Sequence, residues 1–376
     1  MNQYNFSAGP GALPEPVLDA AQAAVREIPE AGLSILGISH RSDWFRQVVD
    51  EIEDNIRQLL KIPKGYHVLF LQGGSSLQFS MIPMTLLRGR QYPAEYLRTG
   101  YWSSKSIPEA CREGRVNVLW DGEPQGFTRL PHDEELSFGK DASYFHYVSN
   151  ETVEGLQFHR IPGQDDVPRI CDMSSDFLSR PIDIKRFALI YAHAQKNLGP
   201  AGVTVVILHD DVLQLAPDGL HTILDYRPHA VKRSIYNTPP VFAIYVALLV
   251  TRWLQDEIGG LTVMEVINTA KATLLYQLLD ESDGFYQQRA SIEDRSMMNV
   301  VFNLPTRALE DRFLETAAHA GFSGLSGHRT IGGVRASLYN AVTMDAVEAL
   351  CNFMSDFQRR EMSVKQRHHS PSIFSR

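Results

Sequence analysis

The chain has 376 residues, of which 44% are hydrophobic and 21% charged, and its formal net charge is −8. This length suits two globular domains, and a chain of this size buries enough core to be stable without disulfides. The negative charge argues against a general nucleic-acid-binding protein, which would need a basic face.

Short apolar runs alternate with helical patterns in the first half of the chain. We expect a strand at 67–72, a helix over 77–87, and further strands at 144–148, 169–172, 189–192 and 203–208. Strands separated by helix-length stretches predict crossover connections, and so a mainly parallel sheet with helices on both faces. A ligand of such a sheet is expected beyond the carboxyl ends of its strands.

The pattern changes in the last third of the chain. Helices are predicted over 239–258 and 261–279, then a strand at 298–303, a helix at 308–320, a strand at 333–337 and a helix at 344–360. This order is typical of a small α+β unit. We therefore expect an N-terminal segment 1–15, a large α/β domain 16–264, a small C-terminal domain 265–361, and a tail 362–376 that lacks apolar periodicity and should be mobile.

Two features bear on the compartment. The three cysteines, Cys111, Cys171 and Cys351, are far apart and do not have metal-binding spacing, so we expect reduced thiols and no metal site. The N-terminus lacks a secretory signal pattern, and the longest apolar run, 241–250, is too short to span a bilayer. A cytoplasmic protein with no membrane partner is therefore expected.

Gly73, Gly74, Ser75 and Ser76 lie between a predicted strand and a predicted helix. Glycines let the backbone approach an anion closely, and the free N–H groups and positive dipole end of the helix favour phosphate. No Gly-Lys-Ser/Thr follows, so this is not a Walker A loop. The motif predicts a phosphate site, and the alternative is an ordinary tight turn.

Two charged residues stand at predicted strand ends. Asp172 ends the strand at 169–172, where a carboxylate can pair with a cationic ring nitrogen; the alternative is a helix N-cap. Lys196 lies between two predicted buried strands, where an unused charge would be costly. A buried lysine is a suitable Schiff-base amine, although most lysines are surface charges. Together with the phosphate loop, these residues indicate a pyridoxal 5'-phosphate (PLP) site.

The chain resembles the phosphoserine aminotransferase family, whose members are PLP enzymes of fold type I, over almost its whole length. The matching motifs, in the family's order, are Asn5-Phe-Ser-Ala-Gly-Pro10, Ser39-His-Arg41, Gly73-Gly-Ser-Ser-Leu-Gln78, Gly100-Tyr-Trp102, Asn150-Glu-Thr152, Asp172-Met-Ser-Ser175, Ala194-Gln-Lys-Asn-Leu-Gly-Pro-Ala-Gly202, Tyr236-Asn-Thr-Pro-Pro240, Gly327-His-Arg329 and Gly332-Gly-Val-Arg-Ala-Ser337.

The resemblance implies roles for the cofactor-binding residues. Lys196 corresponds to the catalytic lysine that binds PLP covalently, and Asp172 to the partner of the ring nitrogen. Trp102 corresponds to the aromatic residue that stacks on the ring, and Thr152 to the hydroxyl near its phenolic oxygen. The remaining cofactor residues implied are Ser75, Ser76, Ser174 and Gln195, with Asn237 and Thr238 reaching the phosphate of a partner subunit, which makes the protein a homodimer with shared sites.

The resemblance also implies how substrates are bound. Arg335 corresponds to the residue that binds the substrate α-carboxylate, and His40, Arg41, His328 and Arg329 correspond to residues that converge on the substrate phosphate. The implied reaction converts L-glutamate and 3-phosphohydroxypyruvate into 2-oxoglutarate and O-phospho-L-serine, in serine biosynthesis. Some members also act on 4-phosphohydroxy-L-threonine, in PLP (pyridoxine) biosynthesis.

One departure and two alternatives accompany this hypothesis. Some family members carry an arginine in the phosphate loop, whereas this loop reads Gly73-Gly-Ser-Ser-Leu-Gln78, so the selectivity for a phosphorylated substrate is in question. The alternatives are another fold-type-I aminotransferase, such as an alanine–glyoxylate type, and a PLP-binding regulator without activity.

Overall fold

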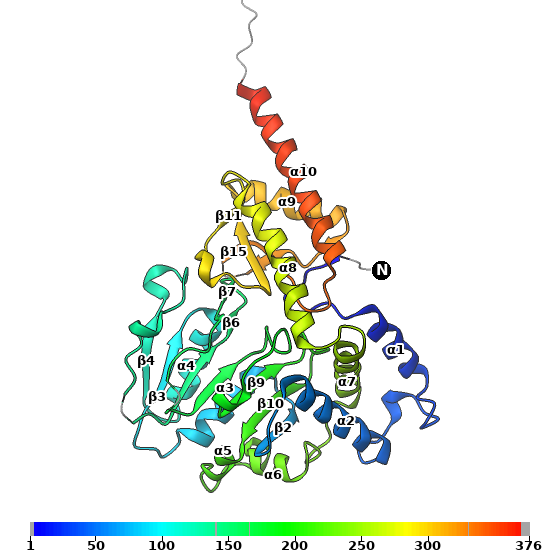
Figure 1. Cartoon of the computed structure of the whole chain (residues 1–376), viewed down its shortest axis with the longest axis vertical. Coiled ribbons are helices and arrows are strands. Elements are labelled where there is room, and N and C mark those ends of the chain that lie inside the picture. The colour runs from blue at the N-terminus through cyan, green and yellow to red at the C-terminus, as the bar shows by residue number, and fades with distance from the viewer. Residues whose placement is uncertain (1–3, 140, 165, 330, 370–376) are drawn as a thin grey trace, which may run out of the picture.

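The structure is a computed structural model that describes residues 4–139, 141–164, 166–329 and 331–369. A larger body holds a seven-stranded sheet, and a smaller body above it holds a four-stranded sheet (Figure 1). The long helix α8 (Leu261–Asp280) runs from the larger body into the smaller one. The expected α/β class, with a large sheet domain and a smaller C-terminal unit, is confirmed.

The central sheet has the strand order β2-β10-β9-β8-β5-β3-β4. Neighbours from β9 to β4 are parallel, whereas β10 is antiparallel to both β9 and β2, so the sheet is mainly parallel but mixed. The reversal has a simple cause, because residues 194–203 between β9 and β10 are too few for a crossover. The strands are β2 (Tyr66–Leu71), β3 (Ala94–Arg98), β4 (Val116–Asp121), β5 (Tyr144–Val148), β8 (Arg169–Asp172), β9 (Leu189–His193) and β10 (Thr204–His209).

Helices cover both faces of this sheet. Side chains alternate along β10, so Val206 and Leu208 pack on one face while Val205 and Ile207 pack on the other. The first face is covered by α3 (Gly74–Leu86), α4 (Tyr101–Cys111), α5 (Asp210–Gln214) and α6 (Tyr226–Val231). The second face is covered by α1 (Glu15–Arg26), α2 (Asp43–Leu60) and α7 (Val241–Asp256).

The smaller body has its own core. Its antiparallel sheet has the order β11-β12-β15-β14 and packs with α8, α9 and α10. Met264 of α8 belongs to the core of the larger body and Ala272 to that of the smaller one, so α8 contributes to both cores. The bounds are β11 (Gln287–Gln288), β12 (Asn299–Asn303), α9 (Arg307–His319), β14 (Ser326–His328), β15 (Gly332–Ser337) and α10 (Met344–His369).

The N-terminal segment lies on the smaller body. Strand β1 (Tyr4–Asn5) pairs in parallel with β13 (Phe322–Ser323), and Phe6 is fully buried in the core of that body. The segment then passes the sheet edge, where Gly11 N–H donates to the carbonyl of Gln195 at 2.8 Å. The first residues of the chain therefore connect the two bodies.

The C-terminal helix extends beyond its predicted end at residue 360. Helix α10 continues to His369 and projects beyond the smaller body (Figure 1). Glu361 forms an ion pair with Arg312 of α9 at 2.6 Å, and no proline or glycine interrupts the sequence before Pro371. The predicted mobility of residues 370–376 lies outside the described residues.

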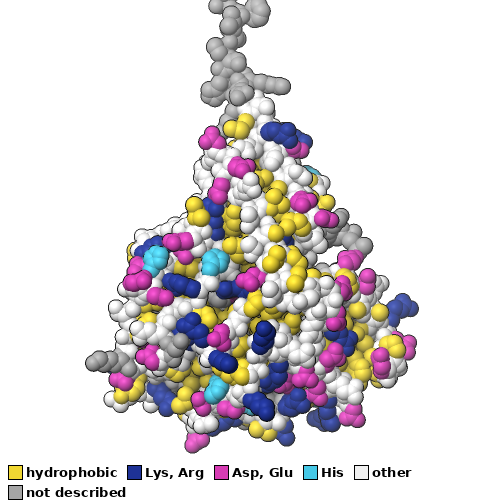
Figure 2. Space-filling model, in the orientation of Figure 1, with side chains coloured by type: hydrophobic (Ala, Val, Ile, Leu, Met, Phe, Trp, Pro, Cys, Tyr) yellow, Lys and Arg dark blue, Asp and Glu magenta, His cyan; other side chains and the backbone are white. Residues whose placement is uncertain are grey.

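The surface and the helices give two further observations. Acidic and basic side chains are interspersed over the face of the molecule shown in Figure 2. Within the described ranges, none of the helices has the length and apolar character needed to cross a membrane.

Lys271 of α8 is fully buried, and its Nζ donates to the carbonyls of Leu338, Tyr339 and Val342 at 3.1, 2.9 and 2.9 Å. Lys271→Met keeps the apolar stem but leaves these carbonyls unsatisfied. We expect the free energy of unfolding in urea to fall by about 2 kcal/mol or more. The exposed control Lys64→Met should stay within about 0.5 kcal/mol of wild type; an equally small change for Lys271→Met would contradict the prediction.

Candidate active site

Asp172 and Lys196 meet at the carboxyl edge of the sheet. Asp172 is the last residue of β8, and Lys196 lies in the turn that follows β9; the two are 4% and 8% exposed. Burial lowers the pKa of Lys196 to about 8, although the Asp172 carboxylate opposes this shift. Burial also raises the pKa of Asp172, against hydrogen bonds from Ser174. A buried amine with a pKa near neutrality can exchange a proton during a reaction.

The N-terminus of α3 opens beside this pair. Gly73 has φ +90°, and a Cβ there would lie 2.5 Å from Leu77 Cδ2, so only glycine fits. The helix has no side-chain N-cap, which leaves its first N–H groups available. Ser75 Oγ lies 2.7 Å from Ser174 Oγ, which in turn donates to the Asp172 carboxylate. The predicted phosphate loop and the strand-end acid therefore share one hydrogen-bonded cluster.

Trp102 covers the lysine from α4. The Lys196 Nζ lies 5.5 Å from the centre of the indole ring, close enough for a cation–π contact. Trp102 Nε1 donates to Thr152 Oγ1 at 2.9 Å, which fixes the orientation of the ring. Thr152 follows the short strand β6 (Asn150–Glu151), which pairs with β7 (Leu156–Gln157). Two of the residues implied by the resemblance thus hold each other in place.

Two buried carboxyl groups meet the N-terminus of α4. Glu151 accepts hydrogen bonds from the N–H groups of Trp102 and Ser103, each at 2.9 Å, and Glu154 accepts one from Tyr101 at 2.9 Å. Both carboxyls crowd Gly100, whose Cβ would lie 2.5 Å from Glu154 Oε2 and 2.7 Å from Glu151 Cδ. Burial and the nearby Glu151 raise the pKa of Glu154 to about 9. At neutral pH, the pair therefore retains a proton.

Arg335 of β15 extends from the smaller body into this edge. One guanidinium nitrogen donates to the carbonyl of Thr152 at 3.1 Å, and Nε is buried without a partner among the described residues. Burial lowers the pKa of Arg335 from its ordinary value. A guanidinium with donors left over suits a carboxylate ligand.

Four further predicted cofactor residues are Gln195, Asn237, Thr238 and Ser76. The Gln195 amide packs against the N-terminal segment, since a Cβ on Gly9 would lie 3.2 Å from its Nε2. Asn237 Nδ2 donates to Gln72 Oε1 at 3.4 Å, and Gln72 Nε2 donates to the Thr238 carbonyl at 2.5 Å. Asn237 and Thr238 therefore lie at the end of β2 of their own chain. Ser76 lies in the first turn of α3.

The two His-Arg pairs lie in different places. His40 and Arg41, just before α2, line a cavity of about 700 Å³ together with Asn237 and Thr238. His328 ends β14 in the smaller body, where the centre of its ring lies 4.7 Å from that of Tyr101 of α4, with the two rings tilted by 52°. Arg329 follows it and is exposed. Neither His328 nor Arg329 lines the cavity that holds His40, so this single chain does not bring the two pairs together.

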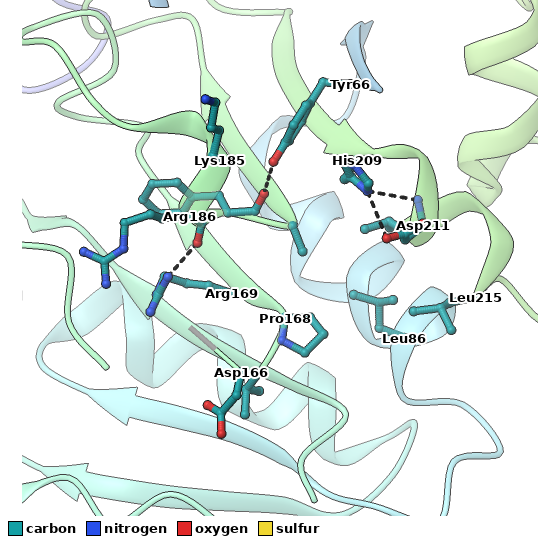
Figure 3. Close-up of a pocket in the computed structure, with 14 residues that line it drawn as sticks. Tyr66, Leu86, Asp166, Pro168, Arg169, Lys185, Arg186, His209, Asp211 and Leu215 are labelled. Carbon is teal, nitrogen blue, oxygen red and sulfur yellow. Dashed lines mark hydrogen bonds and ion pairs between the residues drawn. The ribbon is translucent and has the colours of Figure 1, made fainter. Parts of the chain in front are cut away.

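Another cavity, of about 450 Å³, lies at the opposite, amino-terminal edge of β8 and β9 (Figure 3). Polar groups there are engaged with the backbone: Tyr66 donates to the Phe187 carbonyl at 2.9 Å, and Arg169 to the Arg186 carbonyl at 2.6 Å. None of the predicted site residues lines this cavity. The carboxyl edge therefore carries the candidate active site.

Three residues of the site were missed by the sequence analysis. Glu151 and Glu154 flank the matched Thr152 but were given no role, although an acidic residue within a buried segment is itself a signal of function. His193 stands three residues before Lys196, and its N–H donates to Ser174 Oγ at 3.2 Å. The position of His193 at the end of a buried strand could have indicated a role in the site.

Comparison with known proteins agrees with this geometry. The family model of aminotransferase class V matches residues 3–350. Phosphoserine aminotransferase of Laribacter hongkongensis is 49% identical over 360 residues, which cover 96% of this chain and 99% of that protein. The structure of phosphoserine aminotransferase from Bacillus circulans subsp. alkalophilus has a TM-score of 0.93 and 45% identity, covering 96% of this chain and 99% of that chain.

A PLP-bound phosphoserine aminotransferase from Trichomonas vaginalis has a TM-score of 0.88 and 37% identity, covering 94% of this chain and 99% of that chain. The fold and the lysine–aspartate site define a class-V aminotransferase. The chain belongs to that family and, within it, to the phosphoserine aminotransferases. It is therefore a transferase, and its family implies PLP as the cofactor.

The residues present fit that cofactor. A buried amine, a buried strand-end carboxylate and an indole ring lie together, and the uncapped start of α3 leaves donors for a phosphate. PLP needs a lysine amine, an acid partner for its ring nitrogen and an anion site, and each of these groups is available here.

Glu154→Gln tests the retained proton. Between the unfolded pKa of 4.5 and the folded pKa of about 9, the unfolded chain loses a proton that the folded chain keeps, so stability falls as pH rises. The neutral glutamine removes this dependence. We expect the variant to be more stable than wild type by roughly 1–3 kcal/mol at pH 8 and nearly equal at pH 4.5 in urea denaturation. Exposed Glu134→Gln is the control. If the free energy of unfolding of Glu154→Gln depended on pH as that of wild type does, Glu154 would not be the group that retains the proton.

Proposed function

We propose that the chain transfers the amino group of L-glutamate to 3-phosphohydroxypyruvate, giving 2-oxoglutarate and O-phospho-L-serine. The observation that carries this proposal is the convergence of Lys196, Asp172, Trp102 and Arg335 at one sheet edge. It is supported by the near full-length similarity to phosphoserine aminotransferases. The corresponding pathway is serine biosynthesis.

PLP, when bound, supplies an electron sink for the bonds of the substrate α-carbon. Lys196 would hold it covalently, Asp172 would face its ring nitrogen, and Trp102 would cover the ring. Ser75, Ser76, Ser174 and Gln195 would surround its phosphate, and Thr152 would lie near its phenolic oxygen. The hydrogen bond between Trp102 and Thr152 supports the assignments of these two residues, because it holds their side chains together.

Lys196 is the proposed general base and acid of the proton transfer. Its pKa of about 8 means that an appreciable fraction of the amine is neutral near physiological pH. A neutral amine can accept the proton of the substrate α-carbon at Nζ, and the ammonium formed in this way can donate a proton later in the reaction. Arg335 would hold the α-carboxylate through its guanidinium, whose Nε has no partner among the described residues.

A second copy of the chain would complete the phosphate site of the substrate. His328 and Arg329 lie on the smaller body, whereas His40 and Arg41 line a cavity with Asn237 and Thr238 on the larger one. A homodimer in which the partner supplies the second group would bring both His-Arg pairs to one substrate. This arrangement also gives Asn237 and Thr238 access to the cofactor phosphate of the partner subunit.

The same two anion sites would accept 4-phosphohydroxy-L-threonine, a longer phosphorylated substrate of PLP biosynthesis. Both substrates carry a carboxylate and a phosphate, so Arg335 and the His-Arg pairs would play the same roles. We propose the cytoplasm as the working compartment. All three cysteines are free thiols, which is consistent with a reducing environment.

Substrate choice is tested by spectral titration of the purified protein with PLP. O-phospho-L-serine and L-glutamate should shift the visible absorbance of the cofactor at low concentration, whereas L-serine and L-alanine should not, because they lack the second anion. Lys196→Ala should bind PLP but should not convert it with any amino donor. If alanine acted as well as phosphoserine, an alanine–glyoxylate type of aminotransferase would replace this proposal. A protein that is yellow but inert would point to a regulator.

Arg335→Leu should weaken every substrate, because all share the α-carboxylate. Loss of a bidentate charge-assisted contact is worth about 3 kcal/mol, so kcat/KM for glutamate and for phosphoserine should each fall about a hundredfold. The exposed control Arg112→Leu should leave both values unchanged. Steady-state kinetics with glutamate and with phosphoserine measure the effect. A loss confined to one of these substrates would show that Arg335 contacts the side chain of that substrate instead of the shared α-carboxylate.

A further inference from the structure

His193 lies beside the start of α3. It is the last residue of β9, and its side chain faces the same side of the sheet as Tyr191, which packs against Phe79 of α3. A Cβ built on Gly74, the first residue of α3, would lie 3.9 Å from His193 Nε2. The imidazole therefore borders the opening where the helix exposes its first N–H groups.

Hydrogen bonds tie His193 to the same cluster as the phosphate loop. Its backbone N–H donates to Ser174 Oγ at 3.2 Å, and Ser174 Oγ lies 2.7 Å from Ser75 Oγ. The Gly202 N–H donates to His193 Nε2 at 3.4 Å. Since Nε2 accepts this bond, the neutral ring carries its hydrogen on Nδ1. The backbone of His193 is therefore tied to Ser174 and its ring to Gly202.

The phosphate opening otherwise contains few positive charges. Ser75, Ser174 and Gln195 are neutral, the loop has no arginine, and the amine of Lys196 is committed to the cofactor. A phosphate monoester carries nearly two negative charges at neutral pH. The helix dipole supplies only about half a positive charge. An additional positive charge would balance the remaining negative charge of the phosphate.

His193 can supply that charge. It is half-buried, and burial together with the Lys196 ammonium holds its pKa below the ordinary value. A phosphate dianion beside the ring would oppose both influences, because an adjacent negative charge favours the protonated imidazole. The ring then takes up one proton from solvent at Nε2, gives up the bond from the Gly202 N–H and becomes a donor at both nitrogens.

We propose that His193 is a phosphate-binding residue of the cofactor site, which becomes protonated as the phosphate enters and donates an N–H to one of its oxygens. This assignment deepens the proposed function and rests on it, since it needs PLP as the ligand. It also predicts a specific discrimination: pyridoxal, which lacks the phosphate, offers His193 no partner.

The test compares PLP with pyridoxal. The full-length protein is freed of cofactor, and the dissociation constant of each compound is measured by absorbance for wild type, His193→Gln and the control His67→Gln. His67 lies on β2 and bonds Asp210 at 2.7 Å, away from the phosphate opening. We expect His193→Gln to weaken PLP about tenfold or more, as for a lost charge-assisted hydrogen bond, and to change pyridoxal less than about twofold.

Two results with His193→Gln would overturn the assignment. An unchanged affinity for PLP would show that the ring does not contact the phosphate. An equal loss for PLP and pyridoxal would show that His193 supports the pocket around Lys196 instead. If wild type bound neither compound, the proposed cofactor itself would be wrong, and this assignment with it. Should His193→Gln fail to fold, His193→Asn allows the same comparison.

Discussion

The burial of one amine is the constraint on which the active site depends. Lys196 is held at the carboxyl edge of the sheet between the Asp172 carboxylate and the Trp102 ring. Burial favours the neutral amine and Asp172 favours the charged one, and the balance leaves its pKa at about 8. A more exposed lysine would remain charged, and one without Asp172 would lose its proton more readily. The turn after β9, which fixes the lysine, also makes β10 antiparallel, so the irregularity of the sheet and the position of the amine have one cause.

Two helices begin at this edge, and their N-termini are used differently. The N–H groups at the start of α4 are already taken by the carboxyls of Glu151 and Glu154, which fix the turn that carries Trp102. The start of α3 has glycines and serines and no side-chain cap, so its donors are left for an anion from outside. The protein therefore rigidifies one helix end with its own acids and keeps the other for a ligand. The proton shared by Glu151 and Glu154 limits the negative charge that this arrangement brings near Asp172.

Much of the fold followed from local patterns. The buried strands β2, β5, β8, β9 and β10 each contain a short apolar run and were predicted within about a residue of their bounds. Strands β3 and β4 were missed, because Glu95 and Arg98 interrupt the first and the second is a half-exposed edge strand. The end of α10 was also misjudged, since helix propensity continued after the apolar periodicity stopped. In the site, Lys196, Asp172, Trp102 and Thr152 were found through motifs, but Glu151, Glu154 and His193 were not, because their importance depends on which groups surround them.

The sequence by itself determined the class of fold and the kind of chemistry. The alternation of strands and helices specifies a mainly parallel sheet, and a lysine, an aspartate and a glycine-serine loop at strand ends specify a PLP site. Only the tertiary structure decided how these groups act, because pKa values and hydrogen bonds depend on distances between residues far apart in the chain. Burial gives Lys196 its reactivity, and the approach of α4 to β6 gives the two glutamates their N–H partners. The packing of α3 against β9 places His193 beside the phosphate loop, and no local pattern contains that information.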